Sequence, residues 1–185
     1  MGEIEDKSKQ SKEYNWKTYK FAKNEYNLTK YCNNSKYGLN GFTVNLTELL
    51  PEDEAAYQNK KFYNYKFHIP TKEQFEELIN YTNNYWINNY DPNKLVHNPK
   101  DDEGIKGLNG RIFEGKNGNQ LFIPDAGYRG GTDITNYVGS SGCLWSSKLL
   151  KSNFAAYLLV FNSDDILIHQ HSRRYGHSVR PVINL

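Results

Sequence analysis

Residues 155–171 read AAYLLVFNSDDILIHQH, which is two apolar runs separated by four polar residues. Branched and aromatic side chains favour strands, and Asn, Ser and Asp favour the turn between them. The stretch therefore predicts two antiparallel strands, residues 155–161 and 166–171, joined by the turn NSDD. A third strand is expected at residues 178–183, after a turn near Tyr175 and Gly176.

The two faces of this predicted sheet differ in character, because successive side chains of a strand point to opposite faces. One row is aromatic and branched throughout and should face the core; it contains Tyr157, Leu159, Phe161, Ile166 and Ile168. The other row mixes apolar side chains with histidine and contains Leu158, Val160, Leu167, His169 and His171. We expect this mixed row to form an exposed surface.

Upstream of the sheet, the sequence predicts helices. Thr71 and Gln74 have the spacing of a capping box. Apolar and threonine positions then recur at helical spacing on one face, at Phe75, Leu78, Ile79, Thr82 and Trp86. Pro51, followed by three acidic residues, predicts a second helix start.

The stretch between that helix and the sheet predicts a loop followed by a hairpin. Residues 88–110 are rich in Asn, Asp, Pro and Gly, which is typical of a long surface loop. Residues 111–113 and 120–123 flank an Asn117-Gly118 pair, which favours the positive φ angles of a tight hairpin turn. The predicted fold class is α+β, with early helices and a C-terminal antiparallel sheet.

Composition limits the classes of protein that the chain can belong to. Its 185 residues fit one domain, which we place at residues 14–185 after a disordered tail at 1–13. The net charge of +2 predicts no nucleic-acid partner, and the lack of an apolar run of ~20 residues predicts no membrane insertion. Cys32 and Cys143 are too few for a disulfide scaffold, and the sequence leaves open whether they pair.

Several motifs together resemble the Fibrobacter succinogenes major paralogous domain family of bacterial and phage proteins. They are TKYCNNSKYGLNGF (29–42), LLPEDEAA (49–56), HIPTKEQFEELI (68–79), IPDAGYRGGTD (123–133), GCLWSS (142–147), FNSDD (161–165) and RRYGHSVRPV (173–182). The resemblance implies a C-type-lectin-like fold, related to that of formylglycine-generating enzymes. It also implies that a diversity-generating retroelement rewrites adenines in a variable ligand-binding segment at about residues 141–177.

The resemblance, combined with the mixed row of the sheet, gives the candidate ligand-binding residues. They are Ser141, Cys143, Leu144, Leu158, Val160, Asp165, Leu167, His169, His171, Arg174 and His177. Each of these residue types can arise from an asparagine codon by changes at its two adenines. Trp145 is expected to anchor the sheet, and Arg180 to make buried or interfacial hydrogen bonds. The alternative is an ordinary half-buried sheet whose second face packs on the early helices.

These observations predict a non-enzymatic ligand-binding protein, a receptor or adhesion protein, with no cofactor and no metal. Its partner would be a protein or a glycan, and a cell surface or a phage particle is the favoured location. A structural or adhesion module without diversification is the first alternative. A thiol-oxidising enzyme of the formylglycine-generating type is the second, although Cys143 has no second cysteine near it in the sequence. A zinc site formed by His169 and His171 with His177 or Asp165 is disfavoured.

Overall fold

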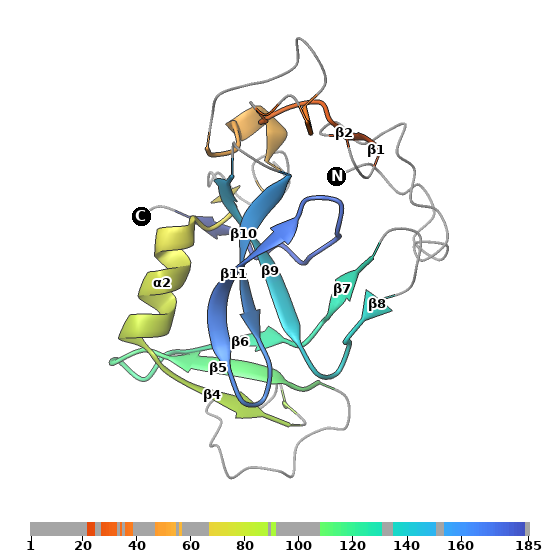
Figure 1. Cartoon of the computed structure of the whole chain (residues 1–185). Coiled ribbons are helices and arrows are strands. Elements are labelled where there is room, and N and C mark those ends of the chain that lie inside the picture. The colour runs from red at the N-terminus through yellow and green to blue at the C-terminus, as the bar shows by residue number, and fades with distance from the viewer. Residues whose placement is uncertain are drawn as a thin grey trace.

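A computed structural model describes residues 22–24, 27–32, 34, 36–38, 47–54, 56, 67–88, 90–91, 108–130, 135–150 and 154–183 (Figure 1). The expected tail at residues 1–13 lies outside these residues, as does most of the loop expected at 88–110. The described residues contain one α-helix and several antiparallel sheets, so the predicted α+β class is confirmed.

The C-terminal sheet has the strand order β11-β10-β9, from strands β9 (Gly142–Leu149), β10 (Ala155–Phe161) and β11 (Ile166–Ser172). The predicted hairpin is confirmed, since β10 and β11 pair in one unbroken register from Ala155 opposite Ser172 to Phe161 opposite Ile166. Its turn is held by Asn162, whose Oδ1 accepts hydrogen bonds from the backbone N–H groups of Asp164 and Asp165. Strand β9 was not expected, because glycine and serine make GCLWSSKL resemble irregular chain.

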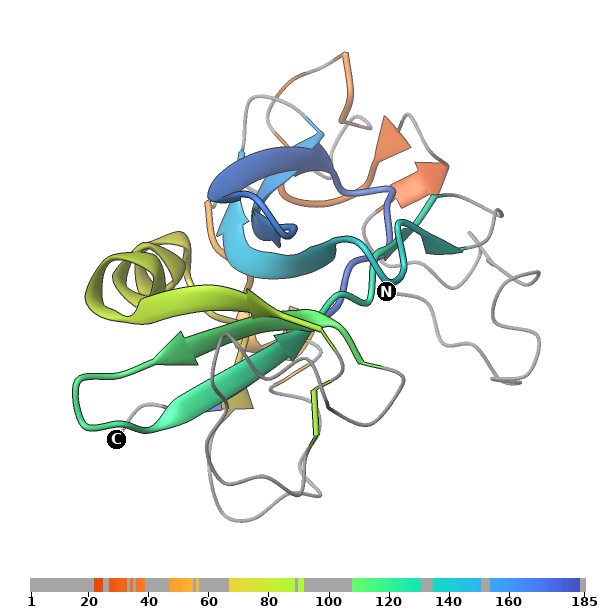
Figure 2. The same ribbon diagram turned by 90° about the horizontal axis from the view of Figure 1, so that it is seen from below.

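A second sheet has the order β4-β5-β6, from β4 (Asn83–Ile87), β5 (Gly110–Glu114) and β6 (Gln120–Pro124). The predicted hairpin at Asn117-Gly118 is confirmed as the β5–β6 turn. Gly118 has a φ of 80°, which is the left-handed conformation that glycine adopts without strain. Figure 2 shows this sheet together with helix α2 beside the β9–β11 sheet.

Helix α2 spans Lys72–Tyr81 and begins with the predicted capping box between Thr71 and Gln74. The prediction that Thr82 and Trp86 continue the helix is wrong. Thr82 is already extended, and Trp86 lies in β4, where the strand pairs with β5. Trp86 still packs against the core, because β4 crosses the same layer of apolar side chains. At Pro51 the expected helix is a single turn of 3-10 helix, η3 (Pro51–Asp53).

The remaining strands are short. Strand β1 (Ala22–Asn24) pairs with β2 (Asn27–Leu28), and β7 (Tyr128–Arg129) pairs with β8 (Thr135–Asn136). The strand expected at residues 178–183 is reduced to β12 (Val182–Ile183), which pairs with β3 (Phe67–His68). Ser178 instead forms a bridge to Leu144 at the open edge of β9.

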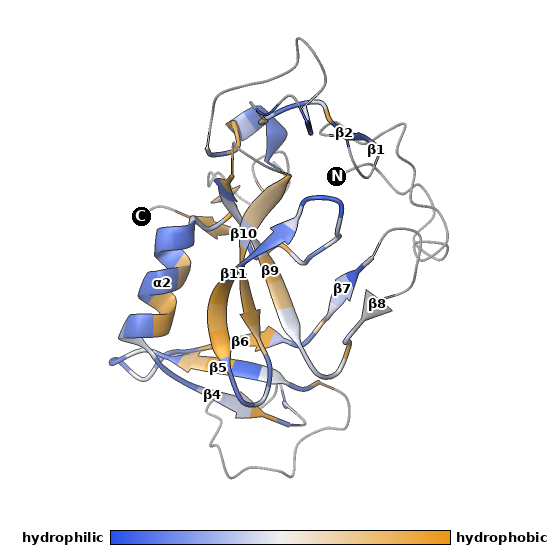
Figure 3. Ribbon diagram, viewed as in Figure 1, coloured by the Kyte–Doolittle hydropathy of each residue, from blue (hydrophilic) through white to orange (hydrophobic). Residues whose placement is uncertain are grey.

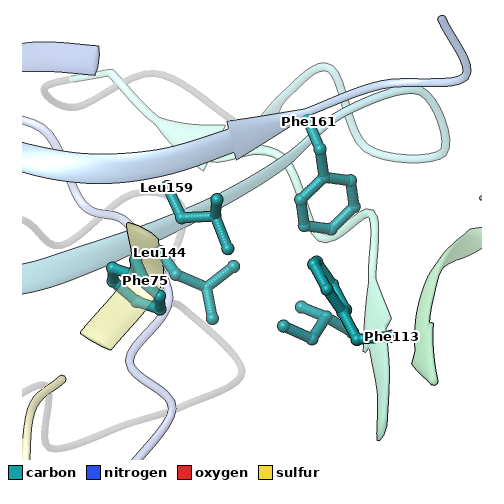
Figure 4. Packing of buried hydrophobic residues seen from close by; sticks show 6 residues of the cluster. Phe75, Phe113, Leu144, Leu159 and Phe161 are labelled. Atoms are coloured by element: carbon teal, nitrogen blue, oxygen red, sulfur yellow. The ribbon is translucent and has the colours of Figure 1, made fainter. Parts of the chain in front are cut away.

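The main core lies between the C-terminal sheet, the second sheet and α2. Six side chains form its buried centre: Phe75, Phe113, Ile123, Leu144, Leu159 and Phe161 (Figure 4). Ile166 and Ile168 pack against this cluster from β11, as predicted for the apolar row. Hydropathy colouring shows α2 polar along its outer side, β10 largely apolar, and β11 apolar in its first part and hydrophilic in its second (Figure 3). The opposite face of the C-terminal sheet therefore carries the candidate site.

Candidate functional site

The candidate site is the face of the β9–β11 sheet that points away from the main core. Residues paired across neighbouring strands share a face, and Leu158 is paired with both Trp145 and His169. In the same way Val160 is paired with Cys143 and Leu167, and Ala156 with His171. The mixed row predicted for these strands is therefore one continuous face, which we call the outer face.

Exposure on the outer face is greatest on β11. Leu167 is 39% exposed and His169 is exposed, whereas Val160 and His171 are half-buried. Leu158 and Cys143 are only 1% and 5% exposed, so these two candidates are enclosed, against the expectation of an exposed surface. Leu158 lies on β10, the central strand of this sheet. Cys143 lies on β9, whose other edge is covered there by Ser178, while β11 has an uncovered edge among the described residues.

Two further candidates are also buried. Leu144 is paired with Leu159 and so lies on the core face, one residue out of phase with the outer face, where it joins the main core. His177 is 4% exposed, because it lies beneath aromatic rings from three segments of the chain. Neither residue can contact a ligand in this arrangement. Ser141 is half-buried, and its hydroxyl donates to the carbonyl of Phe161 at 3.1 Å.

Aromatic residues extend the outer face into a ring cluster, which consists of Tyr128, Tyr137, Trp145, His171, Tyr175 and His177. His171 stacks on Tyr175, with ring centroids 4.1 Å apart and an interplanar angle of 17°. Tyr128 touches both of these rings and stacks on Tyr137 at 5.8 Å. Tyr137 is 64% exposed, so the cluster runs from the buried His177 to solvent. The rings of Trp145 and His177 are nearly perpendicular, with centroids 4.3 Å apart. Trp145 also packs with Tyr31 and Leu149, in agreement with its predicted anchoring role.

Backbone pairing fixes His177 on both sides. Gly176 exchanges two hydrogen bonds with Arg129 of β7, at 2.8 and 2.9 Å. Ser178 donates to the carbonyl of Cys143 at 3.1 Å and accepts from the N–H of Trp145 at 3.0 Å. The segment 176–178 therefore lies between β7 and β9 and holds the His177 ring in the cluster.

The two histidines of the cluster are in direct contact. Nδ1 of His171 lies 2.8 Å from Nε2 of His177. Burial, with a smaller contribution from the nearby His171, lowers the pKa of His177 to about 3. Burial also lowers the pKa of His171, with additional repulsion from His169 and Arg174. Both rings are thus neutral at pH 7, and Nδ1 of His177 has no hydrogen-bond partner among the described residues.

Two buried arginines hold the hairpin that carries the outer face. Arg111 of β5 donates from Nη1 to the carbonyls of Asn162 and Asp165 in the β10–β11 turn, at 2.8 and 3.1 Å. Arg173 donates to the carbonyls of Ala155, Tyr31 and Leu150, at 3.0, 2.9 and 2.6 Å. Arg180 is exposed, so the buried hydrogen bonds that were one expectation for it are made by these two residues instead, and the interfacial alternative for Arg180 stays a prediction. No sequence signal distinguishes Arg173 from its neighbour Arg174. The two differ only in the structure, where the Arg174 guanidinium lies over the Tyr175 ring.

The two cysteines are separate free thiols. Cys32 and Cys143 are both buried and neither forms a disulfide. Burial raises the pKa of the Cys143 thiol, which leaves it protonated and weakly nucleophilic at neutral pH. Among the described residues, no three His, Cys, Asp or Glu side chains gather as a metal-ligand set.

Asp125, at the end of β6, gives a testable pH effect. Its side chain is 5% exposed, Oδ2 has no hydrogen-bond partner among the described residues, and burial raises its pKa from 3.8 to about 6. Because the folded state holds this proton more tightly than the unfolded state, the stabilisation present below pH 3.8 is lost as the pH rises through 6. We expect Asp125→Asn to raise Tm at pH 7.5 by about 2 to 4 °C, which corresponds to about 1 kcal/mol for a chain of this size.

Thermal unfolding followed by circular dichroism measures this effect. The gain from Asp125→Asn should disappear below about pH 4, where the native carboxyl group is also neutral. The exposed Asp164 in the β10–β11 turn provides the control, because a substitution at this surface position, Asp164→Asn, should change the free energy of unfolding at pH 7.5 by no more than about 0.5 kcal/mol. A lower Tm for Asp125→Asn at pH 7.5 would show that the carboxylate is stabilised by its surroundings.

Comparisons with family models, curated proteins and solved structures found no match to this chain. The described fold and site define an α+β protein with an aromatic and histidine-containing surface on its C-terminal sheet. No helix of the described residues has the length and apolar character that a membrane span requires.

Proposed function

We propose that this chain is a non-enzymatic ligand-binding protein with a C-type-lectin-like fold, diversified by a retroelement and directed at a protein or glycan. The observation that carries the proposal is the exposure of Leu167 and His169 on a hairpin whose two ends are fixed by buried arginines. A fixed frame with a heterogeneous open face is the arrangement that allows contact residues to change without loss of the fold.

The binding surface consists of the open part of the outer face and the exposed end of the ring cluster. Its members are Leu167, His169, His171, Arg174, Tyr137 and Tyr175. Tyrosine supplies a large contact area at a small entropic cost, and Arg and His supply directional hydrogen bonds. Leu167 is 39% exposed, so covering the rest of its side chain contributes roughly 0.5 to 1 kcal/mol. Binding after association costs therefore depends mainly on the aromatic and charged members of the surface.

The backbone at Tyr137 supports this assignment. Tyr137 has a φ of 61°, an unfavourable conformation for a residue with a Cβ, and its ring is largely exposed. The conformation is held because its carbonyl accepts from the N–H groups of Ser140 and Ser141, at 3.2 and 3.0 Å. Val138 beside it is 58% exposed. A strained turn that exposes two apolar side chains is typical of a contact site rather than of a connecting loop.

Under this proposal the variable contact positions are fewer than the sequence predicted. Val160, Asp165, Leu167, His169 and Arg174 are at least partly open to solvent and can change identity. Leu144, Leu158, Cys143 and His177 are enclosed, and their exchange would disturb packing. Diversification in this chain would therefore concentrate on β11, the turns at its two ends and Val160 of the neighbouring β10.

The chemistry of the thiols favours binding over thiol oxidation. The thiol of Cys143 is buried at 5% exposure and its pKa is raised, whereas an attacking thiol needs access and a lowered pKa. Cys32 packs in a different apolar cluster, with Leu28 and Tyr37. A structural or adhesion module without diversification would use the same surface, so it is the alternative that experiment must separate.

The exposure of β11 is tested by a paired stability measurement. We expect the double substitution Leu167→Ala, His169→Ala to change the free energy of unfolding by less than about 1 kcal/mol, because neither side chain is enclosed. Leu158→Ala, on the same face but on the inner strand, should cost at least about 2 kcal/mol. Urea denaturation of the three proteins gives both values, and equal losses would show that Leu167 and His169 belong to the core.

Binding is tested with arrays of glycans and of bacterial surface proteins, using the fluorescently labelled full chain. A ligand that uses the binding surface should lose at least about tenfold in affinity with Leu167→Ala, His169→Ala. Glu77→Ala, on the exposed side of α2, is the control and should bind as the native chain does. A ligand whose affinity is unchanged by the double substitution would contradict the assignment of the surface.

Diversification is tested by sequencing the DNA next to the gene. The proposal expects a nearly identical repeat of the 3′ coding segment, with adenines at the codons of the open positions on and around β11. Without such a repeat in any isolate, the structural or adhesion module is the better description.

A further inference from the structure

The hydrogen bond between His171 and His177 limits how many protons the pair can hold. At 2.8 Å, one of the two nitrogens must carry a hydrogen and the other must be bare. If both rings became cationic, two N–H groups would face each other at that distance. The observed arrangement is therefore compatible with at most one proton in excess of the neutral pair.

A single excess proton already carries a cost. It makes His171 the donor, which requires Nε2 of His177 to accept and Nδ1 of His177 to carry the other hydrogen. That nitrogen is fully enclosed and has no acceptor among the described residues. The buried ring thus opposes protonation of the half-buried one.

The groups around the pair add to this effect. His169 on β11 and Arg174 in the following turn both act on His171 as positive charges. Tyr128 of β7, Tyr175 of the turn and Trp145 of β9 contact the pair with uncharged rings, and the thiol of Cys143 lies near Tyr128. Within the described residues, none of the charges acting on the pair is a carboxylate that would stabilise an imidazolium.

Only one of the two rings is placed so that it can move. His177 is held by backbone hydrogen bonds at Gly176 and Ser178, and its ring is enclosed. His171 is half-buried on the edge strand β11, next to solvent. Loss of the hydrogen bond would therefore release the His171 ring from Tyr175, while the sheet beneath remains paired.

We propose that the His171–His177 pair is a pH switch of the binding surface: on acidification the pair separates, the His171 ring leaves Tyr175, and the contact surface changes while the fold persists. The inference rests on the proposed function for its biological role, because it concerns the same surface. The switch itself is a property of the free protein, so it is tested without ligand.

The test is an NMR titration of the full chain between pH 7.5 and 4. Native His171 should titrate at a midpoint below 6.5, and the ring resonances of Tyr175 and the indole of Trp145 should shift with that same midpoint. His177→Leu should raise the His171 midpoint toward the ordinary value of about 6.5. His171→Phe should abolish the coupled shifts of the Tyr175 and Trp145 rings.

His169→Phe is the matched control, since it removes an exposed histidine from the same strand face but leaves the pair intact. It should keep the coupled ring shifts. The proposal is overturned if His171 titrates without any change at Tyr175 and Trp145, or if the ring shifts coincide with loss of the far-UV circular dichroism signal. Should His177→Leu fail to fold, the half-exposed His171→Phe alone still decides the result. The titration needs no ligand, so its outcome does not depend on the binding arrays. A failure to find a ligand on the arrays would count against the proposed function only.

Discussion

Replacing Arg173 with Ala is expected to lower the free energy of unfolding by about 3 to 5 kcal/mol, the largest effect of any substitution considered. The guanidinium group is 7% exposed and donates to the carbonyls of Ala155, Tyr31 and Leu150. Removing it takes one charged donor from each of three carbonyls in three segments, although the Ala155 carbonyl keeps the N–H of Leu150 as a donor. Each lost hydrogen bond to a charged group costs about 1.5 to 3 kcal/mol. The gain from no longer burying a charge offsets part of this cost.

Urea denaturation gives the measured value, and two substitutions serve as controls. Arg173→Lys should recover only part of the stability, because an ammonium group on one flexible stem does not match three carbonyls spread around a planar guanidinium. Arg180→Ala removes an exposed arginine nearby and should cost less than about 0.5 kcal/mol. Equal losses for Arg173→Ala and Arg180→Ala would show that the buried hydrogen bonds contribute little.

Gly142→Ala is expected to lower the free energy of unfolding by about 3 kcal/mol. A Cβ atom at this position would lie 2.0 Å from Cζ of Phe161, far inside van der Waals contact. Phe161 is 1% exposed at the centre of the main core, so its ring cannot turn away without displacing other core residues. Glycine is therefore required here for close packing between β9 and β10 rather than for its backbone angles.

A double-mutant cycle tests this explanation. Phe161→Leu shortens the opposing side chain and costs stability alone, but combined with Gly142→Ala it should cost less than the sum of the two single substitutions. Thermal or urea unfolding of the four proteins gives the coupling energy. Additive losses would mean that the cost of Gly142→Ala arises from the backbone and not from Phe161.

Local sequence signals predicted those parts of the fold that depend on neighbouring residues. The capping box at Thr71, the Asn117-Gly118 turn and the alternation in 155–171 each correspond to an observed element. Strand β9 was missed because its extended form is set by partners far away in the sequence. Trp86 was assigned to the helix because its position continues the helical spacing of apolar residues. Its strand conformation is set by pairing with β5, which is far away in the sequence.

The candidate site was predicted in part. Alternation placed Leu158, Val160, Leu167 and His169 correctly on one face, and the pairing of the strands confirms this. Burial of Leu158 depends on β10 being the central strand, and burial of Cys143 depends on the segments that cover the other edge of β9; alternation carries no information about either. The contact between His171 and His177 likewise depends on how the chain turns back after β11. The sequence offers one local clue to this return, the glycine at position 176. The structure explains the glycine, because a Cβ there would lie 3.3 Å from Cβ of Arg129.

Strand β9 has a consequence for how the chain acquires its structure. The β9 backbone forms hydrogen bonds with Thr47 and Leu49 near its C-terminal end and with Ser178 in its first half. Along its other side it pairs with β10. Contacts that join residues this far apart in sequence slow folding, because the intervening chain must be ordered before they form. During synthesis, the first half of β9 cannot acquire its second neighbour until Ser178 has left the ribosome. The nascent chain therefore carries an open strand edge until Ser178 has emerged, and chaperone binding at that stage would protect it from aggregation.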